Sequence, residues 1–153
     1  MSAAPGGETR DKILGGRLTL CQPRDGYRFS VEAILLGRFA SARARDRVLE
    51  LGAGCGVVAI MIAALHRPRE VVAIEIQPDL AAMAARNAAS NMLKSMRVVC
   101  ADIRQRKIAG VAPASFDLVI ANPPFRAAAA GRENPVAGRR IARGASAASL
   151  NDF

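Results

Sequence analysis

The stretch Arg47-Val-Leu-Glu-Leu-Gly-Ala-Gly-Cys-Gly-Val57 organises the rest of the chain. Residues 48–51 have the mostly apolar character of a buried strand, and three alternating glycines, Gly52, Gly54 and Gly56, follow them directly. The nine residues 57–65 are all apolar and predict a buried helix. Alternating glycines let the backbone turn sharply and let a ligand approach closely. The sequence therefore predicts a ligand site at the N-terminus of this helix.

The spacing of the glycines bears on which ligand is bound. A dinucleotide fingerprint has its third glycine three residues after the second, where this chain has Val57. The pattern here is Gly-x-Gly-x-Gly, and Glu50 lies two residues upstream of it. It resembles motif I of the class I S-adenosylmethionine-dependent methyltransferases, whose ligand presents a methionine carboxylate. The resemblance implies that Glu50 and the three glycines bind this cofactor.

The segments after the glycine turn alternate between strand and helix. We expect strands at 70–76, 96–100 and 116–121, and a helix that begins at Pro78 and buries one face. This alternation predicts an α/β fold whose right-handed crossovers place helices on both faces of a parallel sheet. Ligands of such folds bind at the carboxyl ends of the strands. At those predicted ends lie Gly52, Glu75, Asp102 and Asn122.

The N-terminal part of the sequence predicts a flexible start over residues 1–12 and then a short hairpin about Gly15 and Gly16. A helix over 31–40 follows, with Ser30 placed to cap it. We expect Gly37 and the polar residues after it to end this helix. Its expected core residues are Ala33, Ile34, Leu35, Leu36 and Phe39.

Composition narrows the class of protein. The chain has 153 residues, of which 51% are hydrophobic, so we expect one globular domain. Its longest apolar run, 57–65, is too short to cross a bilayer, and its start has no apolar signal segment. The three cysteines form no C-x-x-C pair, which favours a cytoplasmic protein. His66 is the only histidine, which excludes a histidine metal site and a Ser-His-Asp triad, and we expect no metal.

Two acids at strand ends are candidates for binding the adenosine part of a cofactor. Glu75 lies nineteen residues after Gly56, where a carboxylate can accept both ribose hydroxyls; the alternative is a strand-end acid that faces water. Asp102 resembles the methyltransferase acid that accepts from the adenine amino group, and the alternative is an Asx turn. The adjacent Ile103 belongs to the same predicted cofactor site.

The tetrapeptide Asn122-Pro-Pro-Phe125 follows the last predicted strand. Its two prolines end the strand and fix the backbone. The Asn122 side-chain oxygen and the Pro123 carbonyl can then hold the two hydrogens of an exocyclic amine, so that its lone pair points at a methyl donor. Phe125 offers a ring on which a flipped base can stack, and core packing is its alternative role. The sequence thus predicts Asn122, Pro123 and Phe125 as catalytic residues.

Taken in order, these motifs look like those of the class I amino-methyltransferases. The upstream segment 22–36 is similar to that of the bacterial tRNA adenine-N6 methyltransferases, which modify the base beside the anticodon of valine tRNA. The resemblance implies a Rossmann-like, doubly wound, mostly parallel sheet with strands in the order three, two, one, four, and S-adenosyl-L-methionine as cofactor. It divides the chain into a hairpin and helix at 13–46, a cofactor-binding core at 47–125, and a basic loop with the start of a helix near Ser149 at 126–153.

The resemblance also implies that the C-terminal strands of the family are missing. The apolar strand 116–121 would then carry an unpaired edge, through which we expect the chain to self-associate.

The charge of the chain favours a polyanion as partner. Twenty-two basic against thirteen acidic residues give a net charge of +9. We expect RNA, most of all tRNA, along a cluster of arginines whose alternative role is a disordered basic loop: Arg126, Arg132, Arg139, Arg140 and Arg143. Guanine-N2 methylation of rRNA, glutamine methylation of release factors and a non-catalytic cofactor- or RNA-binding fragment remain alternative functions.

Overall fold

The computed structural model describes residues 7–25 and 28–123 of the chain. The predictions that lie outside the described residues concern the helix near Ser149 and the side chains of Phe125, Arg126, Arg132, Arg139, Arg140 and Arg143.

Strands and helices alternate through most of the described residues. Their order is β1 (Glu8–Ile13), β2 (Leu18–Pro23), α1 (Val31–Phe39), β3 (Arg47–Leu51), α2 (Val57–Leu65), β4 (Glu70–Glu75), α3 (Pro78–Ser90), β5 (Met96–Cys100) and β6 (Leu118–Ala121).

The strands from β3 onward form one parallel sheet in the order β5-β4-β3-β6. This is the strand order that the resemblance implied, and the α/β fold with a parallel sheet is confirmed. Because β3 is an interior strand of the sheet, the glycine turn that follows it lies in the middle of the carboxyl edge, between the ends of β4 and β6. β6 begins at Leu118 and not at residue 116, and Phe116 packs instead over the Arg47 guanidinium, 4.8 Å from carbon to ring centre.

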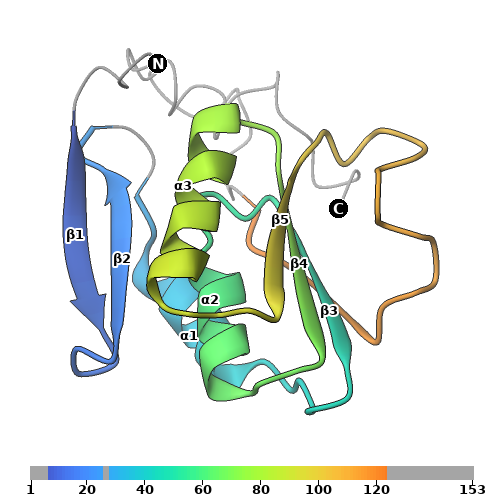
Figure 1. The fold of residues 1–153 in the computed structure, drawn as a ribbon, viewed down its shortest axis with the longest axis horizontal. Coiled ribbons are helices and arrows are strands. Elements are labelled where there is room, and N and C mark those ends of the chain that lie inside the picture. The colour runs from blue at the N-terminus through green and yellow to red at the C-terminus, as the bar shows by residue number, and fades with distance from the viewer. Residues whose placement is uncertain (1–6, 26–27, 124–153) are drawn as a thin grey trace.

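The helices of the described residues all lie on one side of the sheet, so the expectation of helices on both faces is wrong for this part of the chain (Figure 1). Helix α2 is the central one, and its residues 57–63 are all buried. The opposite face is covered by the irregular connection between β5 and β6. This connection packs Ile103, Ile108 and Phe116 against Leu49 and Val72. It contains Gly110 and Pro113 and has no helical spacing of apolar residues, so its own sequence opposes a helix.

Two arginines fasten this connection to the sheet. The Arg47 guanidinium donates to the Ser115 carbonyl at 2.8 Å and pairs with Glu70 at 2.8 Å. Arg97 pairs with the other oxygen of Glu70, also at 2.8 Å, and donates to the Gly110 carbonyl. Glu70 therefore joins both arginines, and they hold the connection against the sheet face that lacks helices.

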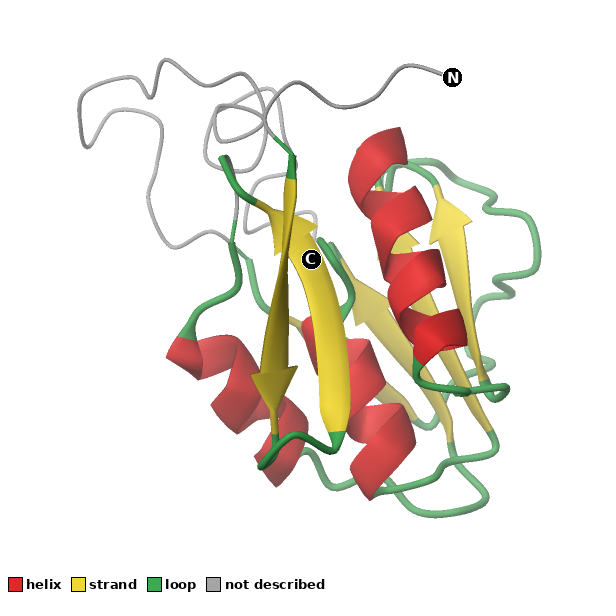
Figure 2. Ribbon diagram, turned by 60° about the vertical axis from the view of Figure 1, so that its left-hand side comes forward, coloured by secondary structure: helices red, strands yellow, loops and turns green. Residues whose placement is uncertain are grey.

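The N-terminal hairpin is longer than the sequence predicted. β1 pairs with β2 in antiparallel register from Glu8 opposite Pro23 to Ile13 opposite Leu18. The expectation of a flexible start is therefore wrong for residues 8–12. Those residues are all polar, so no apolar alternation marks them, and backbone pairing with β2 forms the strand. The hairpin lies across the helices on the side away from the sheet (Figure 2).

Helix α1 packs through small residues, and two of its expected core residues are exposed. Ala33 and Gly37 are its buried residues, whereas Leu35 is 48% exposed and Phe39 76% exposed. Gly37 does not end the helix but faces Met61 of α2, and a Cβ built on it would lie 2.5 Å from the Met61 Cβ. Apolar residues occur on both sides of this short helix, so the sequence pattern could not identify the packed face.

The Gly37→Ala substitution is expected to lower the free energy of unfolding by about 1–3 kcal/mol, because the new methyl group overlaps Met61 and the Val58 carbonyl. Helix propensity alone predicts the opposite, a gain of about 1 kcal/mol. Urea unfolding followed by circular dichroism measures the difference. Arg38→Ala, at an exposed position of the same helix, is the control. A Gly37→Ala variant as stable as the control would contradict the close packing of α1 on α2.

None of the helices in residues 7–25 and 28–123 has the length and apolarity that a bilayer crossing needs. The same residues hold no group of three or more His, Cys, Asp or Glu side chains that could bind a metal ion.

Candidate functional site

The glycine loop between β3 and α2 depends on backbone conformations that side chains rarely adopt. Gly52, Gly54 and Gly56 have φ values of 71°, 58° and 87°. The Ala53 amide donates to the Ile74 carbonyl at 2.8 Å, and the Gly56 amide donates to the Ala53 carbonyl at 2.9 Å. The loop is thus folded tightly at the N-terminus of α2, as the glycine spacing predicted.

Glu75 binds this loop directly. One carboxylate oxygen accepts from the Gly54 amide at 2.7 Å, and the other accepts from the Gln77 amide at 2.9 Å. The residue is 5% exposed. Each carboxylate oxygen offers about two acceptor positions, so one remains on each oxygen for a hydroxyl donor. Glu75 therefore has the chemistry that a pair of ribose hydroxyls requires, and it also holds the loop in place.

Glu50, on β3, acts as the helix cap of α2. Gly56, at the N-cap of α2, has no side chain to offer, and one Glu50 carboxylate oxygen accepts from the Ala59 amide at 2.9 Å. Glu50 is 1% exposed. Burial raises the pKa of this carboxyl from 4.5 to about 8, and the Glu75 charge adds to the rise, while the Ala59 amide opposes it. Glu50 is therefore mostly protonated at neutral pH.

The Glu50→Gln substitution is expected to flatten the pH dependence of stability. Because the folded-state pKa of Glu50 is raised, the folded chain keeps a proton that the unfolded chain loses, and stability falls as pH rises from 4.5 to about 8. Glutamine retains an acceptor for the Ala59 amide and does not titrate. Between about pH 5 and pH 8, the free energy of unfolding of the original chain should fall by more than about 1 kcal/mol relative to that of the variant. Parallel curves from denaturant titrations at several pH values would contradict the raised pKa.

The register of the sheet brings the predicted site residues together. Leu51 lies opposite Ile74 on one side and opposite Ala121 on the other. The next residue on each strand is Gly52, Glu75 and Asn122, so these three lie at one level across the carboxyl edge. Asn122 and Pro123 are half-buried there. The convergence of strand ends that the sequence predicted is present for these three strands.

Asp102 lies two residues beyond β5 and binds locally. One of its oxygens accepts from the Arg104 amide at 2.9 Å, which is an Asx turn, and both oxygens accept from the Arg104 guanidinium. These hydrogen bonds lower the pKa of Asp102 to about 2, so the carboxylate is charged at neutral pH. Ile103 packs against the cluster of Leu49, Val72 and Ile74. The Asx turn, the alternative from sequence, forms here, and contact with an adenine stays a prediction.

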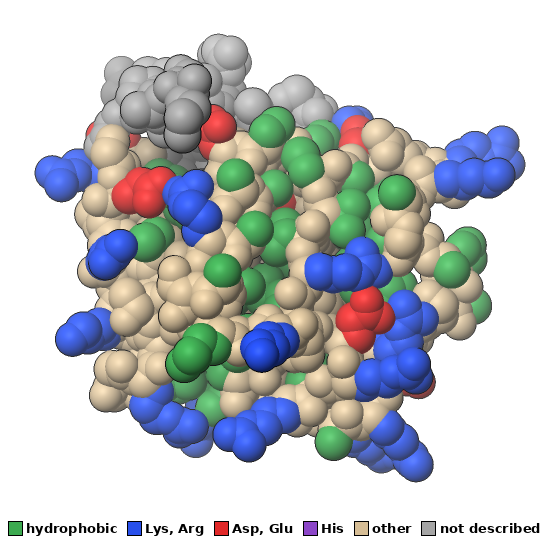
Figure 3. Space-filling model, in the orientation of Figure 1, with side chains coloured by type: hydrophobic (Ala, Val, Ile, Leu, Met, Phe, Trp, Pro, Cys, Tyr) green, Lys and Arg blue, Asp and Glu red, His purple; other side chains and the backbone are tan. Residues whose placement is uncertain are grey.

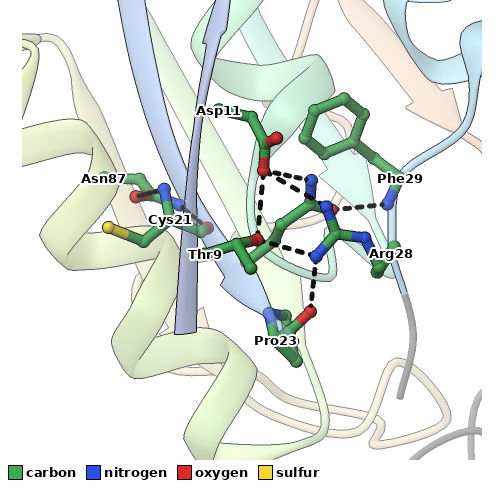
Figure 4. A network of polar contacts seen from close by, with 8 residues as sticks. Thr9, Asp11, Cys21, Pro23, Arg28, Phe29 and Asn87 are labelled. Carbon is green, nitrogen blue, oxygen red and sulfur yellow. Dashed lines mark hydrogen bonds and ion pairs between the residues drawn. The ribbon is translucent and has the colours of Figure 1, made fainter. Parts of the chain in front are cut away.

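Sequence reasoning missed two side chains that fix parts of the site: Asn87 holds the glycine loop, and Arg28 holds the segment before α1. Asn87 of α3 donates to the Cys55 carbonyl within the loop at 3.0 Å. Arg28 donates to Thr9, Asp11 and the Pro23 carbonyl and so fastens the segment before α1 to the hairpin (Figure 4). The position of Asn87 on the buried face of α3 was a signal for its contact with the loop, because a buried amide needs hydrogen-bond partners.

Comparison with known proteins decides the family. Residues 31–150 match the family described as the methyltransferase small domain. The chain belongs to the methyltransferase small domain family. The resemblance to methyltransferases that the glycine pattern and Asn122-Pro-Pro-Phe125 suggested is thereby confirmed.

Several curated relatives of this methyltransferase-family chain share one name. A protein of Flavobacteriaceae bacterium (strain 3519-10), named "tRNA1(Val) (adenine(37)-N6)-methyltransferase", is 32% identical over 114 residues, which are 71% of this chain and 46% of the relative. A protein of Escherichia coli O157:H7 with the same name is 35% identical over 104 residues, 67% of this chain and 42% of the relative. The chain spans about half the length of the curated relatives it matches.

Solved structures agree with the family on the fold. The structure of M. jannaschii TYW2 in complex with AdoMet has a TM-score of 0.58 at 22% identity, covering 69% of this chain and 48% of that one. A putative transferase from Pyrococcus horikoshii has a TM-score of 0.56 at 21% identity, covering 65% and 38%. The described part of this methyltransferase-family chain thus has the Rossmann-like α/β fold of class I methyltransferases.

Proposed function

We propose that the chain is the cofactor-binding part of an S-adenosyl-L-methionine-dependent methyltransferase that acts on an exocyclic amine of a nucleobase in RNA. The observation that carries this proposal is the single level at which Gly52, Glu75 and Asn122 end their neighbouring strands. A cofactor held by the first two would present its reactive group near the third.

The residues of the crevice suit the cofactor. Three glycines at positive φ form the tight loop, and Gly56 among them packs closely against Ala84 of α3. The Glu75 carboxylate has acceptor positions left for the ribose hydroxyls, and Asp102 is charged and within the same edge. Glu50 and Ile103 complete the predicted site: Glu50 fixes the start of α2, and Ile103 packs the connection after β5 against the sheet. S-adenosyl-L-methionine, when bound, supplies an electrophilic methyl group.

Asn122 and Pro123 would act on the acceptor amine. An amine conjugated to a base ring is a poor nucleophile, because its lone pair is spread into the ring. Two acceptors that hold its hydrogens, the Asn122 side-chain oxygen and the Pro123 carbonyl, orient the lone pair for in-line attack. As the amine gains positive charge during attack, both acceptors stabilise it. Phe125, outside the described residues, would provide the surface on which the base stacks.

The names of the curated relatives favour adenine N6 in tRNA beside the anticodon as the substrate. Guanine N2 in rRNA uses the same acceptor chemistry and is the nearest alternative. Glutamine in a release factor is disfavoured by the net charge of +9. A non-catalytic cofactor- or RNA-binding fragment is the alternative from another class, and the coverage of less than half of the relatives keeps it open to test.

We propose that the arginine cluster after Phe125 contacts the RNA backbone. Over the described residues, basic side chains are spread around the face shown in Figure 3 and do not gather into one patch. Our candidate for the RNA contact is the cluster Arg126, Arg132, Arg139, Arg140 and Arg143, because it follows the catalytic tetrapeptide directly.

Each arginine-to-alanine change in this cluster is expected to weaken binding to tRNA and to reduce the dependence of log affinity on log salt by about one unit. Fluorescence anisotropy with labelled tRNA over a range of salt concentrations measures the slope. Arg38→Ala, on α1, is the control. A slope that none of the five changes alters would remove the cluster from the RNA interface.

The location and assembly of the protein follow the same proposal. We propose a cytoplasmic location, in keeping with a tRNA substrate; the cysteines among the described residues are free, as is usual in a reducing compartment. β6 is at the end of the sheet in the described residues, and Val119 on it is 53% exposed. We propose that two copies of the chain pair through that edge. Sedimentation of the isolated chain as a stable monomer would contradict this pairing.

Calorimetry tests the cofactor assignment before any substrate is known. The 153-residue chain should bind S-adenosyl-L-methionine and S-adenosylhomocysteine and should not bind NAD, since the loop lacks the third glycine of the dinucleotide pattern. Binding of NAD in preference to either would overturn the proposed function.

A further inference from the structure

Two asparagines, Asn87 of α3 and Asn91 at its C-cap, complete the free edge of the hairpin. The Asn91 side-chain oxygen accepts from the Thr19 amide at 3.0 Å, and its nitrogen donates to the Thr19 carbonyl at 2.8 Å. Asn87, one helical turn earlier, forms the same two bonds with Cys21, at 2.7 and 2.8 Å. Residues two apart on a strand present their amides and carbonyls to the same edge. The two side-chain amides thus pair with β2 as a further strand would.

The two asparagines differ in their third hydrogen bond. The Asn91 nitrogen donates to the Asn87 carbonyl, within its own helix, at 2.8 Å. The Asn87 nitrogen donates instead to the Cys55 carbonyl of the glycine loop at 3.0 Å, and Asn87 is 1% exposed. Asn87 therefore connects three elements, namely the hairpin, α3 and the loop, whereas Asn91 connects two.

The bond from Asn87 fixes a particular peptide group. The peptide between Cys55 and Gly56 has its carbonyl held by Asn87 and its amide held by the Ala53 carbonyl at 2.9 Å. Gly56 on that peptide has a φ of 87°, and a Cβ on it would lie 3.0 Å from the Ala84 Cβ. Glycine rotates easily, so a peptide in this place can flip if one end is released. Both ends are held here, and the two hydrogen bonds oppose such a flip.

The hairpin end of this connection is itself fixed. Gln22, directly after Cys21, is 3% exposed; its amide nitrogen donates to Asp11 at 2.7 Å, and its oxygen accepts from the Phe29 amide at 3.2 Å. Arg28 adds bonds to Asp11 and Thr9. Figure 4 shows this network on β1 and β2, with Asn87 beside Cys21. Gln22 is buried and the rest of the network is part-buried, and its hydrogen bonds and ion pair hold the strand with which Asn87 pairs.

We propose that Asn87 is a positioning residue: it holds the Cys55–Gly56 peptide and makes the N-terminal hairpin a structural part of the cofactor site. The effect on the cofactor rests on the proposed function. The effect on the loop does not, because it concerns only the hydrogen bonds of the chain itself.

The test compares Asn87→Ala with Asn91→Ala in the full 153-residue chain. Each variant loses two bonds to β2, so we expect similar decreases in melting temperature. Only Asn87→Ala loses the bond to Cys55, so its affinity for S-adenosylhomocysteine in calorimetry should fall about tenfold or more, and that of Asn91→Ala less than about twofold. Amide hydrogen exchange at residues 54–57 should accelerate in Asn87→Ala alone.

The outcomes separate the two proposals. If the original chain does not bind S-adenosylhomocysteine but the loop still exchanges faster in Asn87→Ala alone, the proposed function fails and the positioning role stands. Equal effects of both variants on exchange and affinity would overturn the positioning role. Should Asn87→Ala not fold, the side-chain amide signals of the original chain decide by nuclear magnetic resonance: Asn87 should exchange more slowly than Asn91, and the reverse order would overturn the role.

Discussion

Asn122→Ala is expected to lower the rate of methyl transfer to RNA by at least about a hundredfold and to leave the affinity for S-adenosylhomocysteine within about twofold. Asn122 lies at the level of Gly52 and Glu75 on the carboxyl edge but follows a different strand, β6. Its proposed partner is the acceptor amine and not the cofactor. Its loss should therefore affect the chemical step, which single-turnover transfer of a labelled methyl group measures.

Asn122→Asp is the matched variant for this prediction. Aspartate keeps an acceptor oxygen at the same place, so it should retain more activity than alanine, although its charge alters the site. A loss of cofactor affinity as large as the loss of rate in Asn122→Ala would show that Asn122 belongs to the cofactor site instead.

Glu75→Ala is expected to weaken binding of S-adenosyl-L-methionine by about thirtyfold or more, which corresponds to about 2 kcal/mol. Two effects act in the same direction. The variant loses the acceptor for the ribose hydroxyls, and it leaves the Gly54 and Gln77 amides without their carboxylate partner. Calorimetry measures the affinity, and circular dichroism checks that the variant is folded.

Two further variants serve as controls for the Glu75→Ala prediction. Asp79→Ala removes a neighbouring exposed acid from the start of α3 and should leave the affinity unchanged. Glu75→Gln keeps one acceptor oxygen for the Gly54 amide but loses the charge, so it should bind with an affinity between those of the original chain and Glu75→Ala. Unchanged affinity in Glu75→Ala would remove the residue from the cofactor site.

The sequence predicted the centre of the fold well because several signals coincide there. α2 occupies the predicted residues, Val57–Leu65, since a glycine turn precedes nine apolar residues and His66 follows as its C-cap. β5 also has the predicted bounds, Met96–Cys100. Strand ends could be placed because each buried strand is followed by a turn residue or an acid. The common level of Gly52, Glu75 and Asn122 follows from parallel pairing of these strands.

The periphery could not be predicted because its structure depends on partners distant in sequence. β1 is polar from Glu8 to Lys12, and its pairing with β2 forms the strand. Gly37 indicates a helix end when considered alone, and only the approach of Met61 shows that it is a packing position. Ser30 is the N-cap of α1, as predicted, but forms no capping hydrogen bond.

The candidate site was predictable in its residues more than in its contacts. The acids Glu50 and Glu75 are both buried and both bind backbone amides of the loop and helix, which no sequence pattern shows. The support from Asn87 and the pairing of Asp102 with Arg104 likewise required the structure.

Analysis of methylated nucleosides tests the central proposal most directly. The chain is incubated with isotope-labelled S-adenosyl-L-methionine and separately with bulk tRNA, rRNA and release factor. We expect little methyl transfer by the chain alone, and the labelled product that it forms should be N6-methyladenosine from tRNA when the digested products are examined by mass spectrometry. The Asn122→Ala chain should yield none under the same conditions. Labelled N2-methylguanosine from rRNA, methylglutamine from the release factor, or no labelled product despite cofactor binding would contradict the proposal that this chain methylates an adenine amine in tRNA.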